Sequence, residues 1–234
     1  KVAGKGFKIL KKADIEVESG ICQPEAIKLS APFFKFAKTK KPWVVIKWAQ
    51  SKDGFLARTD GKRWITNSAC RKDVQKLRKR TQAILVGVNT VIEDNPMLTA
   101  RPYADRQPLR VVLDSDLRIP LNSKLIKTAN KYPVCIFTKK NQKIRRPGVE
   151  TIKVGKKDVL EKVLTVLGRK GIQQLLVEGG EKVITSFIRQ NLADEIVIYT
   201  SNETLGKSGK VRASKVMNKL YNMLKKNYDE KKLF

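Results

Sequence analysis

The sequence of 234 residues contains no histidine. Catalysis that depends on an imidazole is therefore excluded, and so are metal sites built on histidine ligands. Any proton transfer must use lysine, aspartate, glutamate, tyrosine or water. The three cysteines, Cys22, Cys70 and Cys135, lie far apart without Cys-x-x-Cys spacing. They predict neither a disulfide framework nor a zinc site, so we expect no metal, and a reducing cytoplasm is their natural setting.

Long apolar runs and acidic residues are also scarce. The longest apolar runs, such as 43–49 and 83–88, are far shorter than the roughly 20 residues that span a bilayer, so we expect no membrane segment and no signal peptide. Only 22 Asp and Glu accompany 50 Lys and Arg, a formal charge of +28 that favours polyanions. Because the lysines are dispersed, we interpret them as a solvated surface and keep a basic nucleic-acid-binding protein as the alternative.

The chain does contain a regular alternation of apolar and amphipathic segments. β-Branched and aromatic runs predict strands at 43–49, 83–87, 109–114, 134–137, 175–177 and 194–199. Apolar residues at helical spacing predict helices at 68–80, 159–167 and 183–190. Residues before 41 predict a separate piece with helices at 6–12 and 25–38 and a strand at 15–17. Alternating strands and helices predict an α/β fold with a mainly parallel sheet flanked by helices.

Two strand ends are candidate ligand sites. The strand at 175–177 ends in Glu178 and two glycines before a helix, a turn whose backbone N–H groups are able to bind phosphate. The segment 87–90 predicts a second turn of this kind. Neither G-x-G-x-x-G nor G-x-x-x-x-G-K-[ST] occurs, so a nucleotide would be held in another way. Arg78 and Arg101 flank one strand and would clamp a phosphate, although two solvated charges are the more ordinary interpretation in so basic a chain.

Six segments match a known family in order and spacing. They are IKWAQSKDG at 46–54, WIT at 64–66, AILVGVNTV at 83–91, DNPMLT at 94–99, PLRVVLD at 108–114 and LVEGG at 176–180. Together they resemble the reductase domain of the riboflavin-biosynthesis deaminase/reductase proteins over roughly residues 42–206. The resemblance implies a dihydrofolate-reductase-like fold and NADPH-dependent reduction of 5-amino-6-(5-phosphoribosylamino)uracil to the ribitylamino product. A reductase of a related pterin or pyrimidine is an alternative, because such folds serve many ligands.

The resemblance also implies roles for individual residues. The positions that match cofactor contacts are Ala49, Trp64, Thr66, Thr90, Asp94, Ser115, Gly180, Glu181, Lys182, Val183 and Ile184. The positions that match substrate contacts are Arg78, Leu98, Arg101 and Glu178, to which Lys62 is added as a phosphate contact. The nicotinamide supplies the hydride to C1′ of the ribosylamine or its opened imine, so no nucleophile is needed. Lys47 is the catalytic candidate, for polarising the opened sugar or moving its protons, and its alternative role is a structural ion pair.

Three departures from the family pattern stand out. Lys62 occupies a position that is usually serine, where it would either contact phosphate or spoil the pocket. Glu181 replaces the usual proline, and a carboxylate there suits the helix dipole but is unfavourable for a pyrophosphate. The part from Lys207 onward is rich in lysine and stops where the family adds a last strand with a Gly-Asp motif.

The domain organisation follows from the same resemblance. Residues 1–41 resemble the tail of the family's deaminase domain, but that domain's zinc site needs a His-x-Glu that this chain lacks. We therefore expect a deaminase-like remnant at 1–41 and a reductase domain, without its last strand, at 42–234. The oligomeric state is left open, with a homodimer as one alternative.

Overall fold

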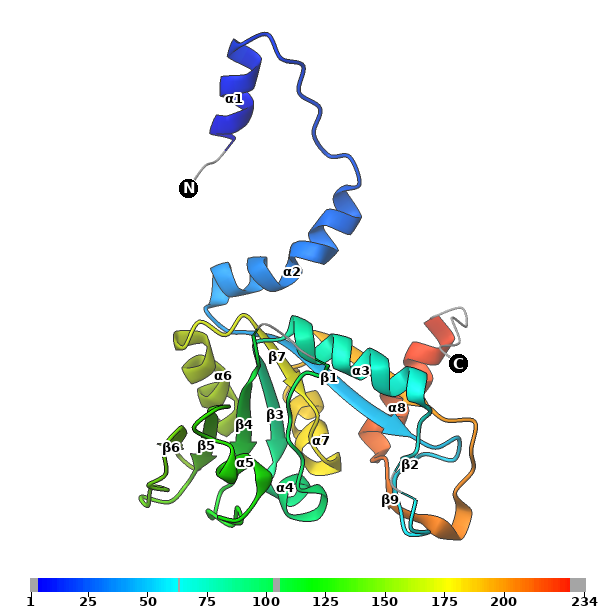
Figure 1. The fold of residues 1–234 in the computed structure, drawn as a ribbon. Helices are drawn as coiled ribbons and strands as arrows, with labels where there is room; N and C mark the ends of the chain where they lie inside the picture. The colour runs from blue at the N-terminus through cyan, green and yellow to red at the C-terminus, as the bar shows by residue number, and fades with distance from the viewer. Residues whose placement is uncertain (1–3, 63, 103–105, 228–234) are drawn as a thin grey trace.

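The computed structural model describes residues 4–62, 64–102 and 106–227, which contain one main sheet of seven strands (Figure 1). In chain order these strands are β1 (Trp43–Gln50), β3 (Ala83–Gly87), β4 (Leu109–Leu113), β5 (Val134–Thr138), β6 (Val149–Lys153), β7 (Gln174–Val177) and β8 (Glu195–Thr200). They lie in the order β6-β5-β4-β3-β7-β1-β8, and every neighbouring pair is parallel. The predicted α/β fold with a mainly parallel sheet is confirmed.

Strand β7 marks the place where the strand order reverses. It is inserted between β3 and β1, because the chain leaves β1, skips one position, adds β3 to β6 outward and then returns to the gap. An open α/β sheet forms its ligand crevice at such a reversal, beyond the carboxyl ends of the strands. The topology therefore points to the ends of β1, β3 and β7 as the place for a site.

Helices cover both faces of the sheet. One face packs against α3 (Ser68–Arg80), α4 (Val88–Asp94) and α5 (Lys124–Lys127), and the other against α6 (Val159–Arg169), α7 (Glu181–Arg189) and α8 (Lys215–Asn227). Helix α3 has the form that its sequence predicts, since Cys70, Val74 and Leu77 recur at helical spacing and are buried. Its first turn is capped by Asn67, whose side chain accepts a hydrogen bond from the Cys70 N–H.

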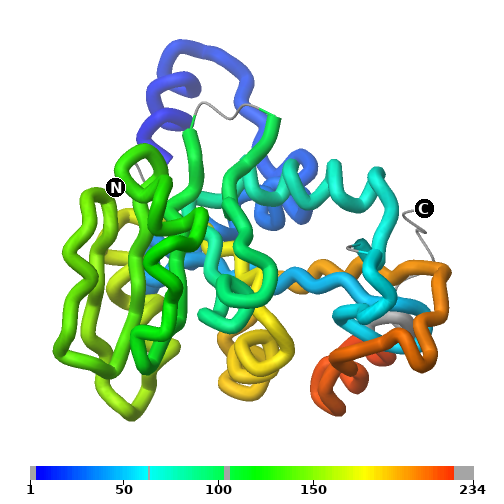
Figure 2. The backbone as a smooth tube through the Cα atoms, turned by 60° about the horizontal axis from the view of Figure 1, so that its bottom comes forward, coloured from blue at the N-terminus to red at the C-terminus, as the bar shows by residue number. Residues whose placement is uncertain are grey.

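A second, two-stranded sheet stands near the carboxyl end of β1. Its strands are β2 (Phe55–Arg58) and β9 (Gly209–Arg212), which pair antiparallel, and the short 3₁₀ turn η1 (Gly206–Ser208) precedes β9. Gly209 lies so close to Phe55 that an added Cβ would approach its ring to 2.3 Å. In Figure 2 this pair, in cyan and orange, lies on one side of α7, and β4 to β6, in green, lie on the other.

The amino-terminal segment projects from one end of the sheet in Figure 1 and contains α1 (Lys5–Lys12) and α2 (Gln23–Thr39). Neither helix has a buried residue, and α2 is tied to the sheet domain by an ion pair between Lys35 and Asp194. The predicted strand at 15–17 is wrong. That stretch lies between the two helices, away from every strand of the described residues, and the Ile15 side chain is exposed.

Several elements differ from the sequence prediction. At the predicted turn at 87–90, β3 ends at Gly87, which is the N-cap of α4, so the chain passes directly from strand to helix there, and its part in cofactor binding stays a prediction. The sequence patterns do not predict β2, β6, β9, α5 or α8. Helix α8 is rich in lysine, yet Met217 is fully buried against the sheet domain. On the β1 side of the sheet β8 is the last strand within the described residues, and the predicted domain end at 228–234 lies outside them.

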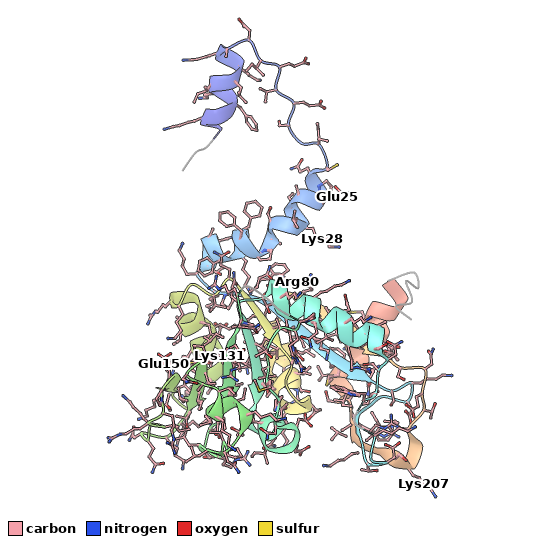
Figure 3. The ribbon with its side chains drawn as sticks, viewed as in Figure 1. Glu25, Lys28, Arg80, Lys131, Glu150 and Lys207 are labelled. Carbon is pink, nitrogen blue, oxygen red and sulfur yellow. The ribbon has the colours of Figure 1, made fainter. Side chains whose placement is uncertain are left out.

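Charged side chains are dispersed over the surface. Figure 3 labels six exposed charged residues at different places along the chain: Glu25 and Lys28 on α2, Arg80 on α3, Lys131 in a turn, Glu150 on β6 and Lys207 in η1. This distribution agrees with the interpretation of the lysines as a solvated surface. Among the described helices, none combines the length and the apolar character that crossing a bilayer requires.

Candidate active site

A pocket of about 2360 Å³ opens at the carboxyl ends of β1, β3, β4 and β7. Sites for drug-sized ligands typically measure about 300–1,000 Å³, so this one has room for two ligands side by side. Every residue that the sequence marks as a site residue lines it. These are Lys47, Ala49, Lys62, Trp64, Thr66, Arg78, Thr90, Asp94, Leu98, Arg101, Ser115, Glu178, Gly180, Glu181, Lys182, Val183 and Ile184. The fold thus gathers them at one place, while their individual roles stay predictions.

Three polar residues form a row on the face of the sheet that α3 covers. They are Glu178 at the end of β7, Lys47 on β1 and Tyr199 on β8. Ile46 pairs with Val177, which places Lys47 beside Glu178 at the end of β7. The ammonium of Lys47 lies 3.8 Å from a Glu178 carboxylate oxygen. On the other side it lies 5.7 Å from the ring centroid of Tyr199, a diagonal neighbour across the β1–β8 pair. Lys47 therefore sits between an anion and an aromatic ring.

Helix α3 supplies a partner for each end of this row. The guanidinium of Arg78 donates to both carboxylate oxygens of Glu178, at 2.7 and 3.0 Å, and to the Thr99 carbonyl at 3.2 Å. The Tyr199 hydroxyl donates to Asp73 at 2.6 Å. Sequence patterns do not single out Asp73 or Tyr199, because only the register of β8 against β1 brings Tyr199 beside Lys47, and only the packing of α3 brings Asp73 to Tyr199. Arg78, predicted to contact phosphate, instead holds Glu178 in this structure.

Burial and charge act in opposite directions on this cluster. Burial lowers the pKa of Lys47 below 10.5, and the charge of Glu178 opposes that shift only in part. Burial alone would raise the pKa of Glu178, but the charges of Arg78 and Lys47 outweigh it and hold that pKa below 4.5. Burial and the bond to Asp73 raise the pKa of Tyr199, so its hydroxyl stays protonated. Glu178 is consequently a fixed anion, and Lys47 is the group in this row whose proton is held most weakly.

The glycine turn after β7 is shaped by close packing. An added Cβ at Gly179 would meet Val183 at 2.7 Å, and one at Gly87 would meet the same side chain at 2.9 Å. A Cβ at Gly180 would stand 3.8 Å from the Thr90 hydroxyl, so two predicted cofactor positions, one on α4 and one at the start of α7, face each other. The ends of β3 and β7 are thus packed closely together through Val183, and Gly87, Gly179 and Gly180 all line the pocket.

We expect Gly179→Ala to lower the free energy of unfolding by about 1–3 kcal/mol, the usual cost of overpacking. The added methyl would overlap the Val183 side chain near its Cβ, which cannot swing aside. Thermal unfolding of the single variant and of Gly179→Ala/Val183→Ala measures this, and the second change should restore part of the loss. Gly6→Ala, where open space surrounds the glycine, is the control. Equal melting temperatures for all variants would show that the turn has room.

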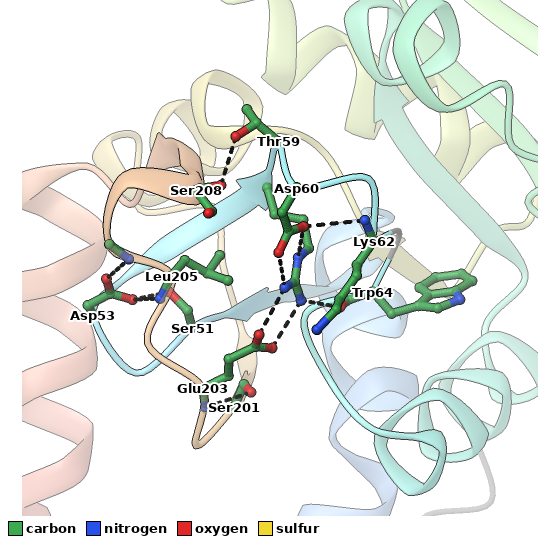
Figure 4. Close-up of polar contacts among 12 residues, drawn as sticks. Ser51, Asp53, Thr59, Asp60, Lys62, Trp64, Ser201, Glu203, Leu205 and Ser208 are labelled. Atoms are coloured by element: carbon green, nitrogen blue, oxygen red, sulfur yellow. Dashed lines mark hydrogen bonds and ion pairs between the residues drawn. The ribbon is translucent and has the colours of Figure 1, made fainter.

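The pocket wall opposite this turn is held by Arg58, the last residue of β2. Its guanidinium donates to the Asp60 carboxylate, to the Trp64 carbonyl at 2.9 Å and to both Glu203 carboxylate oxygens at 3.0 and 2.9 Å. Figure 4 shows Asp60, Trp64 and Glu203 gathered around this point. From α3, Arg71 donates to the Thr66 carbonyl at 2.8 Å and faces the Trp64 ring with 5.2 Å to its centroid.

Comparison with known families places this chain in a recognised group. The model of the RibD C-terminal domain matches residues 42–227. The riboflavin biosynthesis protein RibD of Aquifex aeolicus is 38% identical over 211 residues, which cover 88% of this chain and 59% of that protein. RibD of Actinobacillus pleuropneumoniae is 37% identical over 214 residues, covering 88% of this chain and 57% of that protein. The chain thus spans less than two thirds of the length of these relatives.

Solved structures give the same likeness. A diaminohydroxyphosphoribosylaminopyrimidine deaminase/5-amino-6-(5-phosphoribosylamino)uracil reductase from Thermotoga maritima superposes with a TM-score of 0.77 and 33% identity, covering 90% of this chain and 59% of that one. The riboflavin biosynthesis reductase Rib7 of Saccharomyces cerevisiae superposes with a TM-score of 0.64 at 23% identity, covering 80% of this chain and 87% of that one, and supports the fold alone. The dihydrofolate-reductase-like fold that the resemblance implied is confirmed.

Proposed function

The chain belongs to the RibD C-terminal domain family, and on that premise we propose that it reduces 5-amino-6-(5-phosphoribosylamino)uracil to the ribitylamino product with NADPH. The observation that carries this proposal is the pocket, which gathers all the residues implied in cofactor and substrate binding. Residues from β1, β3, β4, β7 and α3 contribute to it. A surface on which those residues had lost their function would not need to keep them together.

The pocket suits a dinucleotide. Thr90 and Gly180 lie close together on the pocket wall, and Gly180 has no side chain to keep a ligand away from its backbone. Lys182 and Ser115 line the same space, and basic residues outnumber acidic ones around it, which favours the phosphates of NADPH. Trp64, half exposed at the opposite wall, offers a flat apolar surface. When bound, the nicotinamide supplies the hydride.

The remaining part of the pocket suits the substrate. Glu178 is an anion fixed by Arg78, and we propose that it accepts hydrogen bonds from N–H groups of the pyrimidine ring. Leu98 is largely buried in the wall of the same pocket, and we propose that it packs against the ring. Arg101 is exposed at the rim, so we propose that it binds the phosphate together with Lys62, and that Arg78 faces the same phosphate when it is present.

Lys47 is proposed to handle the proton of the reaction. Hydride addition at C1′ of the opened imine leaves a nitrogen that must gain one proton. The Lys47 ammonium faces the pocket, is 15% exposed, and has a lowered pKa because of burial. An ammonium in that state gives up its proton more readily than a solvated lysine does, which suits a general acid.

The direct test is NADPH oxidation followed at 340 nm with and without the phosphorylated ribosylaminopyrimidine. We expect absorbance to fall only when both are present. The same assay with a pterin substrate separates the related-reductase alternative. Folded protein that binds no NADPH, but binds duplex DNA or RNA in a strongly salt-dependent manner, would overturn the proposal in favour of a nucleic-acid-binding protein.

We expect Thr90→Ala and Asp94→Ala each to weaken NADPH binding by roughly threefold to tenfold, the effect of one lost hydrogen bond. Both residues line the pocket on α4, directly after β3. Isothermal titration calorimetry on the purified variants measures the dissociation constant. Thr165→Ala on α6, away from the pocket, is the matched control, because the Thr165 hydroxyl donates to the Glu161 carbonyl of its own helix. Unchanged affinity in both pocket variants would remove these residues from the cofactor site.

We also propose that residues 1–41 are the remnant of a deaminase-like domain. The helices α1 and α2 contain no buried residue, and their apolar side chains are exposed. Such surface is normally covered by a partner. The alternative is that a second copy of this chain covers these side chains in a homodimer. Sedimentation of the purified chain at several concentrations tests that alternative, because a dimer has twice the mass of the monomer.

A further inference from the structure

The wall formed by Thr59–Lys62 and Trp64–Thr66 lies between two parts of the chain, β2 and α3. We propose that Arg58 is a positioning residue of the site: it ties this wall to the loop at Glu203 and so fixes the surface that the cofactor meets. The inference rests on the proposed function, because Trp64 and Thr66 are the residues proposed to contact NADPH. It adds a residue that neither the sequence patterns nor the resemblance pointed to.

The contacts of Arg58 use its whole guanidinium. An arginine carries five N–H donors, and here each one has an acceptor on Asp60, Glu203 or the Trp64 carbonyl. Only 3% of the Arg58 side chain is exposed. A lysine could not reproduce this arrangement, since its ammonium has no planar fork that pairs with two carboxylates at once. We call Arg58 with these hydrogen bonds to Asp60, Glu203 and Trp64 the clamp. It depends on arginine and not merely on a positive charge.

Glu203, the far side of the clamp, is itself held firmly. Its carbonyl accepts a hydrogen bond from the Lys52 N–H at 2.9 Å. Just beyond it, Asp53 accepts from the backbone N–H groups of Leu205 and Gly206 at 3.1 and 2.8 Å (Figure 4). The loop that carries Glu203 is thus anchored to the turn between β1 and β2. Because β1 also carries Lys47, the clamp links the wall to the strand at the centre of the site.

The clamp stays charged over the working pH range. The hydrogen bond from Arg58 lowers the pKa of Asp60 to about 2, and it lowers the pKa of Glu203 as well. The same partners raise the pKa of Arg58. Two carboxylates around one guanidinium leave a surplus negative charge. Lys62 is close enough to lower both carboxyl pKa values, so it compensates for that surplus at the position where the family usually has serine.

On the other side, Arg71 supports the same wall from α3. It bonds to the Thr66 carbonyl and faces the Trp64 ring, so the wall is fixed at two backbone carbonyls by two arginines. Loss of the Arg58 clamp would leave one of these fixed points. The wall would then sample positions that do not match the cofactor, and binding would suffer more than the chemical step.

The test compares Arg58→Lys with the parent protein and with Arg80→Lys. Arg80 pairs with Glu195 at 2.6 Å, but both side chains are largely exposed and neither lines the pocket, so this pair is a matched control. We expect Arg58→Lys to raise KM for NADPH about tenfold, while kcat changes less than about twofold. Arg80→Lys should change neither. A folded Arg58→Lys protein with the parent's KM for NADPH would overturn the proposal.

Two further measurements keep the outcome clear. If Arg58→Lys does not fold, Glu203→Gln replaces it, because Asp60 then still binds Arg58 and only half of the clamp is weakened. A smaller rise in KM supports the proposal, and no rise overturns it. Hydrogen exchange of the peptide covering residues 59–66 needs no activity, so it applies even if the parent protein binds no NADPH and the proposed function fails. Faster exchange in the clamp variant than in Arg80→Lys supports the clamp, and equal exchange overturns it.

Discussion

Lys47→Met is expected to lower kcat by about 100-fold or more, since a positioned general acid contributes roughly 10²–10⁴. Methionine keeps the length and the apolar stem of the side chain but has no proton to give. The stem would still pack in the row between Glu178 and Tyr199. The affinity for NADPH should change little. Single-turnover measurements with NADPH at saturating substrate separate the chemical step from binding.

The pH dependence of kcat gives an independent check on Lys47. The reaction needs the protonated ammonium, so activity should fall as the pH rises through the pKa of Lys47. Burial lowers that pKa below 10.5, and the alkaline limb should therefore lie below the range of a solvated lysine. Lys170→Met, which breaks an exposed ion pair with Glu150, is the control. If Lys47→Met keeps both its rate and the alkaline limb, Lys47 serves as a structural ion-pair partner instead.

Glu178→Gln is expected to lower kcat/KM by roughly tenfold to a hundredfold, the effect of a buried polar group left without its partner. The amide offers an NH₂ where the pyrimidine ring also offers donors. It also leaves Arg78, only 12% exposed, beside a neutral group. A buried charge without compensation is destabilising, so the melting temperature should fall as well. Glu195→Gln, at the exposed Arg80 pair, is the control.

The pH profile of Glu178→Gln identifies the role of this carboxylate. The negative charge of Glu178 raises the pKa of Lys47, so its removal should shift the alkaline limb to lower pH. The alkaline limb itself should remain, because the pKa of Glu178 lies below 4.5 and this carboxylate does not titrate in that range. Loss of an entire limb would mean that Glu178 itself transfers the proton, and the assignment of Lys47 as the general acid would then be wrong.

Local pattern predicts the elements whose stability is mostly local. Helix α3 is one example, because its apolar stripe and its capping Asn67 lie within one short stretch of sequence. Strands β1 and β3 are others, since a continuous β-branched run is typical of a strand buried on both faces. The short strands β2 and β9 have no such signal. They pair with each other although about 150 residues separate them in the sequence. A strand of four residues contains no pattern that predicts its partner.

The candidate site divides in the same way. The sequence by itself identified the residues that we propose bear the chemistry, because ordered motifs around Lys47, Thr90 and Glu178 are visible without a structure. It also excluded imidazole chemistry through the absence of histidine. These conclusions require only the identity of residues and their spacing along the chain.

Only the tertiary structure decided what each of these residues touches. Arg78 binds Glu178, Tyr199 lies beside Lys47, and Arg58 reaches Glu203, although each pair is separated by about 100 residues or more. Such contacts arise from strand order and register, which put distant segments side by side. The pKa of Lys47 and the rigidity of the pocket wall depend on burial and on those neighbours. Both are properties of the packed chain, and no local stretch of sequence contains them.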